Sequence, residues 1–255
     1  MKRLLVLALV AVAGQSMAQL TVNIAETGGL NSPARDLGRT YLAAYENAAL
    51  TGAGGPVQIV GVKFKTTATA SSLPAGGSWP DTAITFADYT MVMGAPSAQF
   101  IADGEFLNTT STFESWTNGL STVRSGSLTM GAGFWQLGQW TSTIMFDTPY
   151  AYDNSTSPGL MFGFQHGGAA GGAGSTGNVW FPAAIGGFVN WNTGTTPGAD
   201  AIASTVAGTP FSSAPNGFSS PLIVEFVTQP VPEPATMAAL GVGVVALLRR
   251  RNKKA

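Results

Sequence analysis

Acidic side chains and a single histidine are the residues of this sequence best suited to catalysis. Asp103 and Glu105 are two positions apart, so they share one face if their segment is a strand, and Glu114 follows nearby. Two carboxylates that flank a glycosidic bond are the chemistry of glycoside hydrolases. Asp103-Gly104-Glu105 also fits a turn with solvated charges, which we favour. His166 has no Gly-x-Ser-x-Gly motif beside it and is expected to be an exposed loop residue. We predict no catalytic site and no enzyme activity.

A second group of oxygen donors lies around a predicted strand. Asp147, Asp153 and Asn154 flank residues 148–152 and supply the ligand type that Ca²⁺ prefers. Asp and Asn are also the preferred residues of turns, and the spacing matches no EF-hand. We therefore predict no cofactor and no metal site, with calcium as the alternative. The glycine-rich residues 167–174 lack the strand-to-helix setting of a phosphate loop and are predicted to form a long loop between strands.

Tryptophans offer a binding chemistry instead. Trp79, Trp116 and Trp180 lie near Pro, Gly or Asn, so they are candidates for display on loops, where indole rings can stack on the apolar faces of sugars. Trp140 alternates within a predicted strand and is expected in the core. Large aromatic residues also dominate β-sheet cores, which is the competing interpretation for all of them. Exopolysaccharide is accordingly an alternative partner.

Charge is distributed unevenly along the chain. Of 12 basic residues, seven lie within a few positions of a terminus, so residues 19–230 hold five basic and twelve acidic residues, a net charge of −7. A domain of this charge repels phosphate backbones, and we expect no nucleic-acid partner. The sequence contains no cysteine, which excludes disulfides, thiolate metal sites and thiol catalysis.

The first residues form a secretory pattern. Lys2 and Arg3 precede the apolar run 4–13, which is too short to span a bilayer. Ser16 and Ala18 then place small residues at the −3 and −1 positions. We predict a signal peptide over residues 1–18, engaged by the export machinery and cleaved between Ala18 and Gln19.

The last residues show three features in a fixed order. Pro232, Glu233 and Pro234 are followed by an apolar run of 14 residues (235–248), shorter than the roughly 20 of a comfortable membrane span. The basic residues after the run keep the end cytoplasmic by the positive-inside rule. That basic end begins with Arg249, Arg250 and Arg251. We expect a short transmembrane helix that holds the precursor at the inner membrane.

These residues, 231–255, closely resemble the PEP-CTERM sorting signal of bacterial surface proteins. The resemblance implies recognition by an exosortase-type peptidase that cuts at or near the Pro-Glu-Pro motif. It also implies a setting of exopolysaccharide and biofilm, with delivery to the cell envelope, cell surface or extracellular matrix. Whether the tail is removed or retained is left open.

The interior, residues 19–230, is predicted to be one all-β domain. Alternating apolar residues recur in segments 60–65, 84–89, 140–146, 160–164 and 222–226, separated by Gly, Pro, Asn and Ser clusters. This pattern favours an antiparallel, jelly-roll-like β-sandwich. Segments 39–65 and 144–161 resemble a β-sandwich domain found in many PEP-CTERM proteins. Residues 33–50 fit a helix capped by Ser32 or an extended segment equally well. The leading functional hypothesis is a non-enzymatic surface or matrix protein; polysaccharide binding is the alternative, followed by a carbohydrate-active enzyme.

Overall fold

The computed structural model describes residues 18–24, 26–31, 34, 38–52, 55–66, 78–80, 82–107, 109–170, 183–186, 198–204 and 208–231. The N-terminal strands are β1 (Ala18–Val22), β2 (Glu26–Asn31), β3 (Arg39–Glu46), β4 (Leu50–Thr51), β5 (Val57–Phe64), β6 (Ser78–Trp79), β7 (Ile84–Phe86) and β8 (Tyr89–Pro96). The later strands are β9 (Thr117–Arg124), β10 (Leu128–Met130), β11 (Trp135–Gln136), β12 (Ile144–Tyr152), β13 (Gly159–His166), β14 (Ala169–Ala170), β15 (Ala183–Gly186), β16 (Ala199–Ser204), β17 (Gly217–Ser219) and β18 (Val224–Pro230). The helical elements are η1 (Asn47–Ala49), α2 (Ala98–Asp103) and η2 (Phe113–Trp116).

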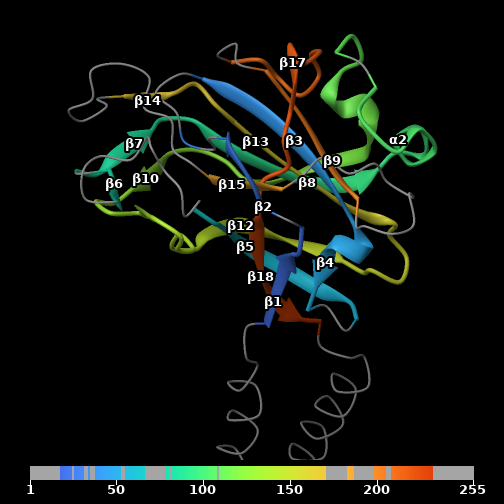
Figure 1. The fold of residues 1–255 in the computed structure, drawn as a ribbon, viewed down its shortest axis with the longest axis horizontal. Coiled ribbons are helices and arrows are strands. Elements are labelled where there is room, and N and C mark those ends of the chain that lie inside the picture. Colours follow the sequence, from blue (N-terminus) through green and yellow to red (C-terminus); the bar gives the residue numbers. More distant parts are fainter. Residues whose placement is uncertain are drawn as a thin grey trace, which may run out of the picture.

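Two antiparallel sheets form the body of the domain (Figure 1). One has six strands in the order β17-β16-β3-β13-β8-β9, and the other has five in the order β12-β5-β18-β1-β4. Their facing surfaces enclose a large core of aromatic and aliphatic side chains. The predicted all-β sandwich is confirmed. Among the described residues, no helix has the length and apolar character needed to cross a membrane, and the predicted terminal helix lies outside them.

The central strands of the six-stranded sheet are buried on both faces. In its central strand β3, Tyr41, Ala43 and Tyr45 enter the core between the sheets, whereas Leu42 and Ala44 enter a second cluster on the opposite face. A strand buried on both faces carries a continuous apolar run instead of an alternating one. This explains why residues 33–50 were ambiguous from the sequence. The extended alternative is confirmed for 39–46, and Ser32 lies outside the described residues.

A second layer covers the outer face of the six-stranded sheet. It consists of α2, η2 and the chain around Phe211, and its apolar side chains pack on the sheet. The Ser97 hydroxyl caps α2 by accepting a hydrogen bond from the Phe100 N–H at 3.1 Å. Gly104 ends this helix with a φ of 76°, a left-handed conformation that favours glycine. The sequence analysis did not predict α2.

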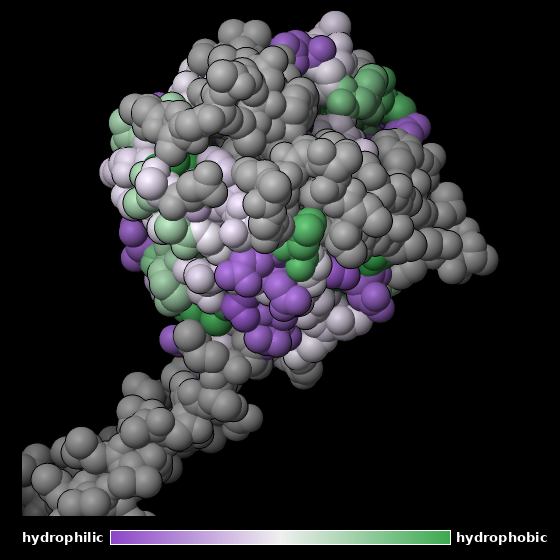
Figure 2. Space-filling model, turned by 60° about the vertical axis from the view of Figure 1, so that its left-hand side comes forward, coloured by the Kyte–Doolittle hydropathy of each residue, from purple (hydrophilic) through white to green (hydrophobic). Residues whose placement is uncertain are grey.

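The outward-pointing residues of the five-stranded sheet include charged side chains. Lys63 and Glu225 are directly opposite each other in β5 and β18, and their charged groups are 2.6 Å apart. Among the described residues, the exposed large hydrophobic side chains are Leu107, Met145, Phe218 and Val231. On the face shown in Figure 2, hydrophobic residues form small, separate patches between hydrophilic ones. The apolar residues of the domain are therefore mainly internal.

Candidate functional site

The tryptophans proposed for sugar stacking are not displayed on the surface. Trp79 is 7% exposed and Trp116 is 3% exposed. The Trp116 ring packs in the second layer, with its centroid 5.8 Å from that of Phe106. Trp79 is paired with Trp135 between β6 and β11. The prediction of loop display is wrong for both. Trp79 packs in the core between the sheets and Trp116 in the second layer, although neighbouring Pro, Gly or Asn residues suggested loops. Trp180 lies outside the described residues.

His166 is also internal. It ends β13 and is 1% exposed, with its ring stacked on Tyr89 at 5.1 Å between centroids. Its Nδ1 accepts a hydrogen bond from the Gly168 N–H at 3.2 Å. The prediction of an exposed loop histidine is wrong, since β13 continues to His166 and places the ring among aromatic side chains. Part of the predicted glycine-rich loop, Ala169–Ala170, forms the short strand β14, and residues 171–182 lie outside the described chain.

The proposed carboxylate pair lies in a turn. Asp103 is the last residue of α2 and accepts a hydrogen bond from the Gln99 side chain at 2.7 Å, and Gly104 then reverses the chain before Glu105. These two acids therefore do not share the face of a strand. The turn interpretation is confirmed.

The residues proposed as calcium ligands form hydrogen bonds with other groups of the protein. Asp147 accepts a hydrogen bond from the Ser125 N–H at 3.0 Å. Asp153 accepts hydrogen bonds from the N–H and hydroxyl of Ser155, which lower the pKa of its carboxyl group. The backbone carbonyl of Asn154 accepts a hydrogen bond from the Asn47 side-chain amide at 2.9 Å. Within the described chain, no three His, Cys, Asp or Glu residues are grouped as a metal site requires.

Asp200 is a buried carboxylate that sequence reasoning missed. It lies in β16 on the side of the second layer and is 1% exposed. Its oxygens accept hydrogen bonds from the N–H groups of Phe106, at 2.7 Å, and Ala201, at 2.6 Å. Burial raises the pKa of Asp200 to about 7 against the opposing effect of these bonds. Asp200 thus attaches the chain after α2 to the sheet.

A cavity of about 360 Å³ opens at one edge of the five-stranded sheet, where β5 begins and where β12 and β18 end. Val57 begins β5 and is paired with Tyr152 of β12 on one side and with Pro230 of β18 on the other. Ala95 of the six-stranded sheet also borders the space. The lining comprises Pro56, Val57, Gln58, Ala95, Tyr150, Ala151, Tyr152, Asp153, Thr156, Ser157 and Val231. We call this space the tyrosine pocket.

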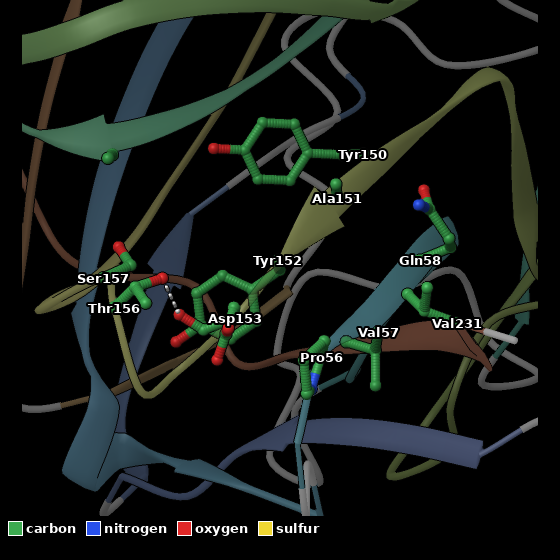
Figure 3. A pocket seen from close by; sticks show the side chains of 11 residues that line it. Pro56, Val57, Gln58, Tyr150, Ala151, Tyr152, Asp153, Thr156, Ser157 and Val231 are labelled. Atoms are coloured by element: carbon green, nitrogen blue, oxygen red, sulfur yellow. Dashed lines mark hydrogen bonds between the residues drawn. The ribbon is translucent and has the colours of Figure 1, made fainter. Parts of the chain in front are cut away.

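Two tyrosine rings form the centre of the tyrosine pocket (Figure 3). Tyr150 and Tyr152 alternate along β12, and burial raises the pKa of both hydroxyls. The Tyr152 hydroxyl donates a hydrogen bond to the Asn47 side chain, whose amide nitrogen bonds in turn to carbonyls of the 153–157 turn. Tyr152 is therefore fixed. Tyr150, which is less buried, is the ring better placed to meet a ligand.

Polar groups surround these rings. Figure 3 shows the turn with Thr156 and Ser157 on one side of Tyr152, and Gln58 and Val231 on the other. The turn is closed by hydrogen bonds within itself, one of which joins the Thr156 hydroxyl to the Asp153 carbonyl at 3.3 Å. A concave site with aromatic walls and a few amide and hydroxyl groups can hold a small ligand that has both an apolar face and polar edges. In the sequence, the two rings appear as the alternation Tyr-Ala-Tyr at 150–152.

Two described segments next to the predicted processing points lie at this edge of the five-stranded sheet. Ala18 begins β1 and is paired with Thr228 of β18, so Ala18 and Gln19 lie beside the last strand of the domain. Val231 follows β18 and borders the tyrosine pocket. The remaining predicted sorting residues lie outside the described residues: Pro232, Glu233, Pro234, Arg249, Arg250 and Arg251.

Comparison with known proteins identifies the C-terminal segment. Residues 230–252 match the family model of the PEP-CTERM protein-sorting motif. No curated protein sequence and no solved structure matches the chain. The matched segment starts at Pro230, the last residue of β18, so the motif follows the folded domain directly. The chain is thus a PEP-CTERM motif-containing protein, exported and targeted to an exosortase for sorting to the cell surface.

Proposed function

We propose that this exported protein is a non-enzymatic component of the cell surface or extracellular matrix that binds exopolysaccharide through the tyrosine pocket. The tyrosine pocket carries this proposal, because it combines a half-buried aromatic ring with amide and hydroxyl groups at an accessible end of the sandwich. The precursor is exported through its signal peptide and is held at the inner membrane by its C-terminal helix until an exosortase acts on the tail.

The pocket lining suits a sugar ring. A pyranose has apolar C–H faces and hydroxyl groups at its edges, so it can pack on the Tyr150 ring while its edge meets hydrogen-bonding groups. The Gln58 amide and the Thr156 hydroxyl supply such groups within the lining. The volume of about 360 Å³ lies in the range of small-molecule sites, which suits one or two sugar units of a longer polymer.

A binding role also agrees with the use of the acidic residues. Canonical glycoside hydrolysis needs two carboxyl groups across the scissile bond. Asp153 is the carboxylate in the pocket lining, and its Oδ1 is engaged by Ser155 within the turn. Elsewhere, Glu46, Asp88 and Asp147 each accept a hydrogen bond from a backbone N–H. These four acids thus hold turns and loops, and the proposed site uses neither metal nor cofactor.

Binding of labelled exopolysaccharide fragments, isolated from the cells that produce the protein, tests this function. The exported protein should bind di- to tetrasaccharide fragments, and Tyr150→Ala should weaken binding at least about tenfold, because one stacked aromatic ring contributes on the order of 1.4 kcal/mol or more. Phe218→Ala removes an exposed aromatic residue outside the pocket and is the matched control. Equal affinity of the Tyr150→Ala and native proteins would contradict the assignment. Fragment shortening during incubation would contradict the non-enzymatic role.

A further inference from the structure

The tyrosine pocket has one charged side chain in its wall. Among the lining residues, all of which belong to the described chain, Asp153 alone is charged at neutral pH. Figure 3 shows Asp153 beside Tyr152 and Thr156. Both described hydrogen bonds to its carboxylate come from Ser155 and are accepted by Oδ1. A carboxylate offers about four acceptor positions, so Asp153 keeps its negative charge and acceptor capacity at the pocket.

A second acidic residue lies next to the pocket wall. Glu46 ends β3 and precedes Asn47, whose side chain accepts the hydrogen bond from the Tyr152 hydroxyl. The Glu46 carboxylate accepts a hydrogen bond from the Gly198 N–H at 2.8 Å, a neutral donor that does not cancel its charge. Arg39 begins the same strand, seven residues away, over about 23 Å at about 3.3 Å per residue. Two negative charges therefore lie at this end of the domain.

The basic residues of the described chain lie at the other end of the strands. They are Arg39, Lys63, Lys65 and Arg124. Lys63 is six residues from Val57 along β5, or about 20 Å. Arg124 donates a hydrogen bond to the carbonyl of Tyr89, where β8 begins, whereas Ala95 near the end of β8 borders the pocket. These separations exceed two Debye lengths of about 8 Å, so the cations do not offset the charge of the pocket.

We propose that the tyrosine pocket selects sugar units without an acidic group, and that the Asp153 carboxylate sets this preference. The preference rests on the proposed function and narrows its ligand class to sugars that carry no carboxylate or sulfate. A uronic acid or a sulfated sugar has its charge within one ring of the face that packs on Tyr150, and would bring it within several ångströms of Asp153. Repulsion between two solvated charges at such a distance lowers affinity by about threefold.

A matched pair of ligands separates the charge of the sugar from its shape. Neutral exopolysaccharide fragments from the producing cells are compared with the same fragments after their primary hydroxyl groups are oxidised to carboxylates. Where the fragments are already acidic, reduction of their carboxyl groups supplies the neutral member. Both members keep the same linkages and ring stereochemistry. Dissociation constants are measured for each member with the exported protein.

Two variants of the protein remove the same charge at different places. Asp153→Asn removes it from the pocket and keeps a side-chain oxygen that can accept the bonds from Ser155, so the turn should be preserved. Asp147→Asn removes one charge from β12 outside the lining and is the matched control.

We expect the native protein to bind the neutral member at least about threefold more tightly than the carboxylated one. Asp153→Asn should bring this ratio close to one, and Asp147→Asn should leave it unchanged. Raising the NaCl concentration from about 0.1 M to about 1 M should also reduce the native ratio, because the Debye length falls from about 10 Å to about 3 Å.

Equal or tighter binding of the carboxylated member by the native protein would overturn the charge preference and leave the proposed function intact. A ratio that neither Asp153→Asn nor salt changes would do the same, because it would reflect shape and not charge. Absence of binding by both members would instead refute the proposed function, and the preference with it.

Discussion

The two large sheets share one core but differ on their outer faces. The outer face of the six-stranded sheet is covered by a second layer that contains Phe100, Phe106 and Trp116. The five-stranded sheet instead carries an ion pair and the exposed Met145 on strands β5, β18 and β12. It also provides the chain ends and most of the tyrosine pocket. The six-stranded side therefore carries an additional packed layer, and the five-stranded side carries the chain ends and most of the proposed binding site.

Trp116→Ala should give the largest loss of stability, because it removes a large side chain from the second layer. Truncation of a buried tryptophan costs about 3–5 kcal/mol through lost burial and the remaining cavity. Urea unfolding of the exported protein, followed by circular dichroism, measures this loss. A change below about 1 kcal/mol would show that the second layer contributes little to the free energy of unfolding. The two sheets would then not differ in how much their outer faces stabilise the domain.

Asp200, on the six-stranded side, should make the free energy of unfolding depend on pH. The raised pKa, about 7 in the folded state against about 3.9 in the unfolded chain, means that the folded state binds more protons between these values. The stability that Asp200 contributes is therefore fully present below about pH 4. As the pH rises to about 7 this contribution is lost, and the free energy of unfolding falls by about 2–4 kcal/mol. Asp200→Asn should remove this fall when unfolding is measured from pH 4 to 8. Asp103→Asn, at the surface end of α2, is the control and should keep it.

Tyr152→Phe should have a smaller effect on the five-stranded side. The substitution deletes the hydroxyl that bonds to Asn47 and holds the pocket turn, a loss of about 1 kcal/mol in unfolding free energy. Tyr150→Phe keeps the Asn47 bond and is the matched control. If Tyr152→Phe were as costly as Trp116→Ala, the pocket would belong to the structural core instead of the recognition surface.

Met145→Ala should have the smallest effect. Met145 is 49% exposed on β12, and surface substitutions of this kind usually change stability by less than about 0.5 kcal/mol. The unfolding midpoint and slope should match those of the native protein. A loss of several kcal/mol would mean that this side is covered in the folded protein, and it would remove the difference between the two sheets.

A strand in which a charged residue alternates with core residues was predictable from the sequence, whereas a strand with apolar residues on both faces was not. The alternation of residues 60–65 correctly indicated β5, because Lys63 alternates with core side chains. In contrast, Leu42 and Ala44 face the second layer, so β3 shows no alternation. The same layer buries Trp116, whose local sequence indicated a loop. Burial by a second layer depends on contacts between distant segments, which local patterns do not reveal.

The tyrosine pocket was hidden for a related reason. Its lining comes from β5, β12, the 153–157 turn, the end of β8 and the residue after β18. Only Asp153 among these was a candidate from the sequence, and it was considered for calcium. The PEP-CTERM motif, by contrast, is continuous in the sequence and was identified from order alone. Contiguous targeting signals can thus be predicted from one sequence, whereas sites assembled by strand pairing need the fold.

The strand order of the five-stranded sheet also determines when the protein can fold. The strand β18 lies between β5 and β1, yet it is the last strand in the sequence. The strands β1 and β5 come early in the sequence, so the position between them stays unfilled until residues 224–230 are available. The five-stranded sheet therefore cannot close on a chain that lacks its last strand, and its long-range pairing favours slow folding. Formation of this sheet is thus tied to the presence of almost the whole domain.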